Sequence, residues 1–322
     1  MTNKEAYQIF TEKNPVSLYN TPWWMDAVCG PENWDVWLYR QGDEILAAMP
    51  YYMERRGDYR YITKAPLTQH NGIIFRHDPG AKLQKRASFE EKVIDEAVSW
   101  LSQQGLDVYE QQYSHHFTNW QPFFWKQFKC VLRYTYVIEE TADPAAVTAG
   151  YSAKLRNDIK KGMQHIASVE TLDPEEFYRE HEKIYAKQNL SCPFSHALWM
   201  RLYQACQAHN SGTTLCIRNH AGEISSLAFV AWDQHYVYLL MGGAIPEHSS
   251  ENTFSCLVHK CIALAGEKEL GFDFEGSMIK RIAKAFRDYG GIPMPYYRIR
   301  KIYNPEIIRM EAEQEIAVLN RG

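Results

Sequence analysis

The 322-residue sequence predicts an α/β (α+β) protein with two domains, each a mixed, mostly antiparallel sheet flanked by helices. The chain is long enough for two ordinary domains. Short β-rich runs joined by turns alternate with amphipathic helical segments along the whole chain. The order of these segments in the first half resembles that in the second, which indicates a duplicated α/β unit. We expect the domains to cover residues 1–145 and 146–322.

In the first half, the pattern predicts a short helix, a hairpin, a long helix and two further strands. The short helix ends at the helix-breaking pair Gly30-Pro31, and the hairpin turns at Gly42-Asp43. The long helix ends at Gly105. These elements are expected at residues 22–28, 34–40 with 45–56, 88–104, 106–113 and 129–139.

The second half follows a junction at residues 141–150. A basic helix and two amphipathic helices precede a three-stranded meander, with turns at Ala221-Gly222 and Asp233-Gln234. A helix, a short strand, a second basic helix and a closing strand complete the pattern. We expect these elements at residues 151–165, 174–189, 195–210, 213–244, 253–270, 271–276, 278–289 and 295–303.

Composition narrows the class of protein. The formal net charge is −4, so the whole chain has no general attraction for nucleic acid or for an anionic membrane. Recognition of phosphate must therefore come from local basic patches. The seven cysteines are scattered, and neither an apolar signal segment nor a run of eighteen apolar residues is present. The sequence predicts a cytoplasmic protein with reduced thiols and without membrane insertion.

The segment "GFDFEGSMIKRIAKAFRDYGG" at residues 271–291 has the strongest pattern for a site. Strand alternation places Phe272 and Phe274 on one face, and Asp273 and Glu275 on the other. A strand end followed by Gly-Ser and a helix is where α/β folds tend to bind ligands. The alternative interpretation is that these are ordinary acidic residues of a strand.

Two helices present cations that suit phosphate binding. In the helix after Ser277, Lys280, Lys284 and Arg287 share an outer stripe. The predicted buried stripe of that helix consists of Met278, Ile282, Ala285, Phe286 and Tyr289. In "YSAKLRNDIKKGMQH", Ser152 caps a helix with an apolar seam of Leu155, Ile159 and Met163 and with cations Lys154, Arg156 and Lys160. The alternative for both helices is a solvated cationic face. No metal-binding spacing is present in the sequence.

Several segments resemble the FemAB-like transferases of the GNAT-like acyltransferase superfamily. They are "FDFEGS" with "AFRDYGG" and "PYYRI", then "YSAKLRNDIKKG", "TPWWMDAVCG" and "APLTQHNGIIF". The resemblance implies two tandem GNAT-like domains. It also implies transfer of an amino acid from aminoacyl-tRNA to an amine of a cell-wall precursor, or another acyl transfer. Arg287 stands where many relatives have Lys, and neither the long helical hairpin of several relatives nor the GNAT pyrophosphate loop is visible.

From this resemblance and the residues we predict an N-acyltransferase. Asp273 or Glu275 would accept the proton of the amine, and Tyr238 or Tyr236 would donate toward the oxyanion or leaving group. The expected phosphate- or substrate-binding residues are Lys154, Arg156, Lys160, Ser277, Lys284 and Arg287. No tightly bound cofactor is expected, and the donor is acyl-CoA or aminoacyl-tRNA. The alternative is a catalytically silent module that binds a phosphorylated sugar or a peptidoglycan fragment.

Overall fold

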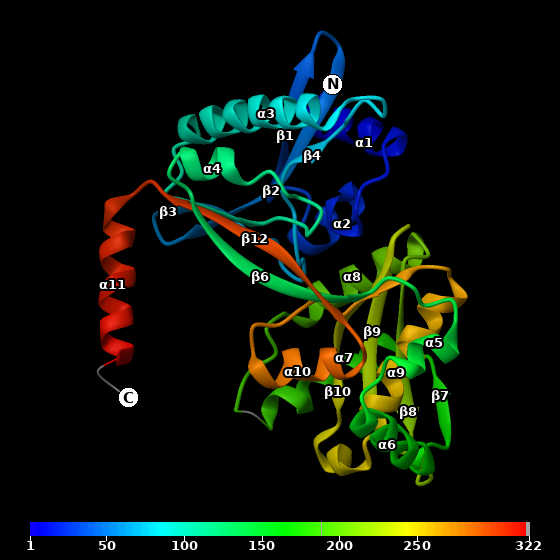
Figure 1. Cartoon of the computed structure of the whole chain (residues 1–322). Helices are drawn as coiled ribbons and strands as arrows, with labels where there is room; N and C mark the ends of the chain where they lie inside the picture. Colours follow the sequence, from blue (N-terminus) through cyan, green and yellow to red (C-terminus); the bar gives the residue numbers. More distant parts are fainter. Residues whose placement is uncertain (188, 320–322) are drawn as a thin grey trace. The chain divides into compact units, whose positions relative to one another are not determined.

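The computed structural model describes residues 1–187 and 189–319, which form two compact units (Figure 1). Among the described residues, the first unit comprises 1–133 and 296–319, and the second comprises those between 134 and 295. The units therefore divide at places other than the expected boundary after residue 145. The end of the chain returns to the first unit because residues 298–302 pair with residues 108–112 in an antiparallel ladder.

The first unit contains a sheet in the order β1-β2-β3-β5-β12, with β4 paired to β2. The predicted short helix, hairpin and long helix are confirmed, and α3 begins five residues before the expected start at residue 88. Helices α1 and α4 were not predicted. The elements are α1 (Asn3–Lys13), α2 (Pro22–Cys29), β1 (Trp34–Gln41), β2 (Glu44–Arg56), β3 (Tyr59–Thr63), β4 (Ile74–Phe75), α3 (Leu83–Gln103), β5 (Val108–Gln112), α4 (Gln121–Trp125), β12 (Ile292–Ile302, from residue 296) and α11 (Pro305–Leu319).

The second unit contains a sheet in the order β6-β11-β10-β9-β8-β7. Its neighbouring strands are antiparallel except for β10 and β11, which run parallel. The elements are β6 (Lys129–Ile138, from residue 134), α5 (Pro144–Ala149), α6 (Ala153–Gly162), β7 (Ser168–Glu170), α7 (Pro174–Ala186), α8 (His196–Ala208), β8 (Gly212–Arg218), β9 (Ile224–Trp232), β10 (Tyr236–Ala244), α9 (Thr253–Glu267), β11 (Gly271–Asp273) and α10 (Lys280–Asp288).

Helices cover both faces of this second sheet. Alternate residues of β9 point to opposite faces, so Val230 packs against the α9 side while Phe229 contacts Phe177 of α7 and Trp199 of α8. Helix α10 belongs to the α9 side, since Phe286 stacks on Phe274 with a ring-centroid separation of 4.8 Å. The sheet is thus the middle layer between two apolar helical layers.

The predicted apolar stripes need three corrections. Met278 and Ala285 of the 278–289 segment are exposed, and so is Met163 at the end of α6. Met278 is exposed because α10 begins only at Lys280, so the residues before it do not follow helical spacing. Met163 likewise lies in a short 3₁₀ turn beyond the last residue of α6.

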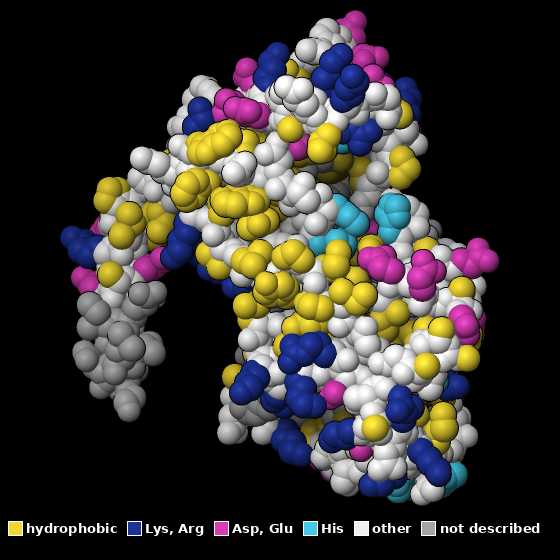
Figure 2. Space-filling view, viewed as in Figure 1, with side chains coloured by type: hydrophobic (Ala, Val, Ile, Leu, Met, Phe, Trp, Pro, Cys, Tyr) yellow, Lys and Arg dark blue, Asp and Glu magenta, His cyan; other side chains and the backbone are white. Residues whose placement is uncertain are grey.

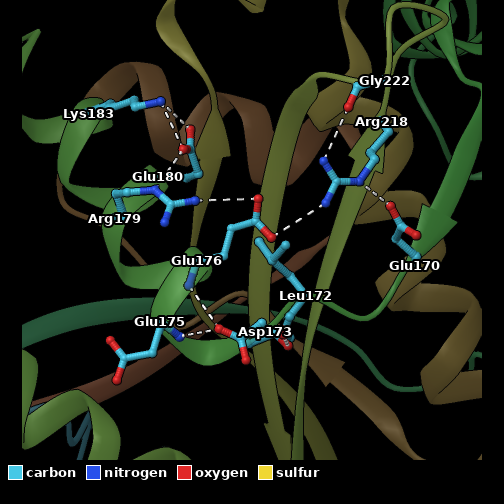
Figure 3. Close-up of polar contacts among 11 residues, drawn as sticks. Glu170, Leu172, Asp173, Glu175, Glu176, Arg179, Glu180, Lys183, Arg218 and Gly222 are labelled. Carbon is cyan, nitrogen blue, oxygen red and sulfur yellow. Dashed lines mark hydrogen bonds and ion pairs between the residues drawn. The ribbon is translucent and has the colours of Figure 1, made fainter.

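A network of ion pairs holds α7 to the edge of the second sheet (Figure 3). Arg218 on β8 contacts Glu170 on β7 and Glu176 on α7. The network continues along α7 from Glu176 through Arg179 and Glu180 to Lys183. Asp173 caps α7 by accepting hydrogen bonds from the backbone N–H groups of residues 175 and 176. This network has a structural role: it fixes α7 over the sheet. Within the described ranges, no helix combines the length and apolar character needed to cross a membrane.

Candidate active site

The candidate site lies where β10 and β11 part. The two strands pair in parallel only at three positions, from Tyr236 with Gly271 to Tyr238 with Asp273. Beyond that point β11 ends, whereas β10 continues to Ala244 beside β9 and contains a bulge near Leu240. A bulge bends its strand and changes the direction in which the neighbouring side chains point. The arrangement leaves an edge of β10 open next to the end of a parallel strand, a position at which α/β sheets bind ligands.

Asp273, the last residue of β11, is almost completely buried, with 1% of its surface exposed. Its Oδ1 accepts hydrogen bonds from the Thr135 hydroxyl and, at 2.7 Å, from the backbone N–H of Glu275. Its Oδ2 is buried without a hydrogen-bond partner among the described residues. Burial raises the pKa of the Asp273 carboxyl to about 7, although both hydrogen bonds act in the opposite direction. A carboxyl group with a pKa near neutrality suits proton transfer.

Tyrosines and further carboxylates surround Asp273. The Tyr238 hydroxyl donates to Asp233 Oδ2 at 2.8 Å, and the Tyr236 hydroxyl donates to both carboxylate oxygens of Glu139 at 2.9 and 3.0 Å. Burial and the charge of Asp233 raise the pKa of the Tyr238 phenol well above its ordinary value. The negative charges of Asp233 and Glu139 also help to raise the pKa of Asp273. Since the single proton of Tyr238 is directed to Asp233, this hydroxyl is not directed toward an oxyanion.

The buried Asp273 carboxyl makes stability depend on pH. Its folded pKa of about 7 lies above the ordinary value of 3.8, so between these values the folded chain keeps a proton that the unfolded chain releases. Stability should fall as pH rises through this window, and the loss is complete above the folded pKa. In Asp273→Asn this loss is absent. As pH rises through this window, we expect the difference in unfolding free energy between Asp273→Asn and wild type to shift in favour of the variant by about 2–4 kcal/mol. Urea unfolding at several pH values measures this, and identical pH dependence in both proteins would contradict it.

The loop after Asp273 differs from the predicted strand. Glu275 and Gly276 have left-handed backbone angles, with φ of 65° and 70°. Strand alternation therefore ends at Asp273 and does not set the direction of the Glu275 side chain, which corrects the prediction that Asp273 and Glu275 share a strand face. Gly276 lies tightly against β6, since a Cβ atom there would meet the carbonyl oxygen of Tyr134 and would approach the Cα of Thr135 to 2.8 Å. The turn thus docks the loop onto β6.

The predicted binding residues of the loop and of α10 are partly engaged in local contacts. The Ser277 hydroxyl accepts a hydrogen bond from the backbone N–H of Ile279 at 3.1 Å. Lys284 pairs with Asp288 at 2.8 Å. Arg287 donates to the Tyr136 hydroxyl at 3.1 Å. The backbone carbonyl of Tyr136 accepts the N–H of Phe274, so Tyr136 links Arg287 to the residue that follows β11.

The predicted binding residues of α6 lie near the other end of α10. Lys154 pairs with Asp158, and Arg156 donates to the backbone carbonyls of Ala149 and Tyr151. Lys160 is exposed on the same helix. Ser152 caps α6 as predicted, and its backbone N–H donates to the carbonyl of Asp288 at 2.8 Å.

Arg156 also lines an open surface hollow of about 760 Å³. The other residues of its lining are Pro144, Ala145, Thr148 and Ala149. This hollow includes neither Asp273 nor Arg287. The structure therefore brings Asp273, Glu275 and Tyr238 together around the end of β11. Arg287 contacts Tyr136 on the α9 side of the sheet, and Arg156 lies at a separate surface.

Sequence reasoning missed three residues around Asp273. Thr135 binds its Oδ1, and Asp233 and Glu139 contribute negative charge. Thr135 lies on β6, Glu139 directly follows β6, and Asp233 lies in the β9–β10 turn, all far from residue 273 along the chain. A hydroxyl on β6 and an acid just after its end are a weak signal in the sequence, since the pairing of β6 with β11 is what brings this segment to Asp273. Among the residues that the structure describes, no group of three or more potential ligands is placed to hold a metal ion.

Comparison with known families defines the class to which this site belongs. The model of the acetyltransferase (GNAT) domain matches residues 153–278, which include β10, the end of β11 and Asp273. This part of the second unit is therefore similar to GNAT acetyltransferase domains, and the predicted resemblance to the GNAT superfamily is confirmed. A search of curated proteins found no match to the chain.

Solved structures show to which proteins the whole fold is similar. A crystal structure of FemX matches with a TM-score of 0.69 and 10% identity, covering 96% of this chain and 98% of the other. The structure of L-PGS from Bacillus licheniformis matches with a TM-score of 0.54 and 11% identity, over 98% and 95%. A tandem GNAT protein from the clavulanic acid biosynthesis pathway matches with a TM-score of 0.53 and 12% identity, over 92% of each chain. The predicted fold, with two tandem GNAT-like domains, is confirmed.

Proposed function

We propose that the protein is an N-acyltransferase that moves an acyl or aminoacyl group from an activated donor to an amine. The observation that supports this most directly is the position of Asp273. A buried carboxyl group with one unpartnered oxygen lies inside a GNAT domain, where β10 and β11 part. Perturbed carboxyl groups at such positions are candidates for proton transfer.

In the proposed reaction, the amine nitrogen attacks the carbonyl carbon of the donor. A C–N bond forms, the proton of the amine passes to Asp273 directly or through water, and the bond from carbon to sulfur or oxygen of the leaving group breaks. The leaving group then takes up a proton. Backbone N–H groups on the open edge of β10 beyond Tyr238 are candidates for stabilising the oxyanion, since β11 does not pair with them. Tyr238 would hold the β9–β10 turn through Asp233.

The cations would bind phosphate groups of the donor or acceptor. Among the predicted binding cations, Arg287 has the most direct link to β11. It donates to the Tyr136 hydroxyl, and the Tyr136 carbonyl accepts the N–H of Phe274, which follows β11. Its planar guanidinium can form two parallel hydrogen bonds with a phosphate. Ser277, Lys284 and the α6 cations Lys154, Arg156 and Lys160 would extend binding along the two helices. The proposed acceptor is an amine-bearing small molecule or a glycan precursor such as a cell-wall precursor.

A donor comparison tests this function. Purified protein is incubated with an amine acceptor panel and with either acetyl-CoA or aminoacyl-tRNA, and the N-acylated product is measured by mass spectrometry. We expect time-dependent product with one donor class, because a thioester of CoA and an ester at the end of a tRNA differ greatly in size and shape. Binding of a phosphorylated sugar or peptidoglycan fragment, without product from either donor, would instead favour the silent binding module.

A further inference from the structure

The connection from β11 to α10 exposes two consecutive aliphatic side chains. Met278 has 57% and Ile279 has 56% of its surface exposed. Ile279 occupies the N-cap position of α10, where no side-chain hydrogen bond caps the helix. Ser, Thr, Asp or Asn is preferred at this position because its side chain accepts a backbone N–H. Ile279 therefore provides no side-chain cap for α10, and neither Met278 nor Ile279 is buried.

The next two residues are cations, also at an unfavourable position. Lys280 and Arg281 open the first turn of α10, which contains no acid. The N-terminal end of a helix carries partial positive charge, so cations there are destabilising. Both side chains are exposed, and within the described part of the chain neither forms an ion pair or hydrogen bond. Lys284 and Arg287 follow on the same outer face. Figure 2 shows Lys and Arg side chains gathered over α10, with hydrophobic side chains beside them.

These features contrast with a net charge of −4 for the whole chain and with α6, α7 and α8, which use Ser152, Asp173 and Ser195 as caps, although α9 also lacks a side-chain cap. Positions at which a sequence breaks local rules tend to be functional. Exposed aliphatic side chains followed by unpaired cations fit a surface that combines an apolar interior with anionic headgroups. Single-stranded nucleic acid fits less well, because bases stack on aromatic side chains and residues 278–284 contain none.

We propose that residues 278–284, the α10 entry segment, bind the surface of an anionic phospholipid bilayer. Met278 and Ile279 would insert at the boundary between headgroups and acyl chains. Lys280 and Arg281 would pair with lipid phosphates. This proposal is independent of acyl transfer, since it concerns binding alone.

Vesicle sedimentation tests the proposal. The probes are vesicles of phosphatidylcholine, with and without phosphatidylglycerol as about one third of the lipid. We expect wild type to partition at least about tenfold more strongly to the anionic vesicles, since each cation near such a surface contributes on the order of a fivefold gain. Lys280→Glu with Arg281→Glu should abolish the preference. Met278→Ser with Ile279→Ser should weaken binding about tenfold because the apolar insertion is lost.

A matched control separates binding by the α10 entry segment from a general effect of reversing two positive charges on the protein. Lys85→Glu with Lys92→Glu reverses two exposed cations of α3 and should leave binding unchanged; circular dichroism checks that every variant is folded. The proposal is overturned by absence of binding to anionic vesicles, by an equal loss in the α3 pair, or by full binding of the Met278/Ile279 pair variant. Displacement from vesicles by a short single-stranded RNA at similar concentration would assign the segment to nucleic acid instead.

Discussion

Asp273→Asn is expected to lower kcat for acyl transfer by about 10²–10³-fold, since a positioned general base contributes a factor of this size. Asn keeps the shape of the side chain and can still accept the hydrogen bonds from Thr135 and Glu275 that Asp273 Oδ1 accepts. The loss therefore reports on proton transfer and not on folding. Steady-state kinetics with the donor and acceptor that the donor comparison selects measures it, and circular dichroism shows whether the variant is folded.

Glu275→Gln is the matched control for this prediction. Glu275 was an equal candidate from the sequence, but it lies in the left-handed turn after β11, and it is Asp273 that has the buried, unpartnered oxygen. We expect Glu275→Gln to keep kcat within about threefold of wild type. If the Gln variant loses activity and the Asn variant keeps it, Glu275 is the base; if both keep full activity, neither residue is.

Gly276→Ala is expected to destabilise the second unit by about 3 kcal/mol, through strain at a left-handed backbone position and through overpacking. The added Cβ would meet the backbone of Tyr134 and Thr135, which cannot move as a side chain does. The loop would have to leave β6 and carry Ser277 and the start of α10 with it. Activity should fall as well, because Glu275 and the Asp273 carboxylate are held by the same turn. Urea unfolding measures the loss of stability.

Gly222→Ala is the control that separates backbone strain from overpacking, the two causes of the loss expected in Gly276→Ala. Gly222 also has a left-handed φ, of 81°, but a Cβ atom there meets nothing within 4 Å. This variant should cost only about 1 kcal/mol, the strain of placing Ala in that conformation. Equal losses in the two variants would show that docking of the Gly276 turn on β6 contributes nothing.

The sequence predicted most of the second unit because its local signals agree with the fold. Ser152 caps α6 where expected, and the turns at Ala221-Gly222 and Asp233-Gln234 separate three strands. Phe272 and Phe274 share a face, with ring centroids 4.9 Å apart. These features depend on neighbouring residues, so the sequence contains enough information to predict them.

The remaining features depend on contacts between distant segments. The Glu275-Gly276 turn forms because the loop packs against Tyr134 and Thr135, which lie some 140 residues earlier on β6. The same pairing brings Thr135 to Asp273 and determines the environment of the carboxyl. Pairing of β12 with β5 likewise moves the end of the chain into the first unit. Periodicity along the chain contains no signal for such long-range pairing.

The pH dependence of kcat/KM tests most directly whether Asp273 is the base of this site. For wild type and an acceptor amine of high pKa, the account predicts a rise of kcat/KM with pH that has an apparent midpoint near the Asp273 pKa of about 7. In Asp273→Asn the residual activity should lack this rise and retain only the rise due to the amine. The same midpoint in both proteins would contradict the account.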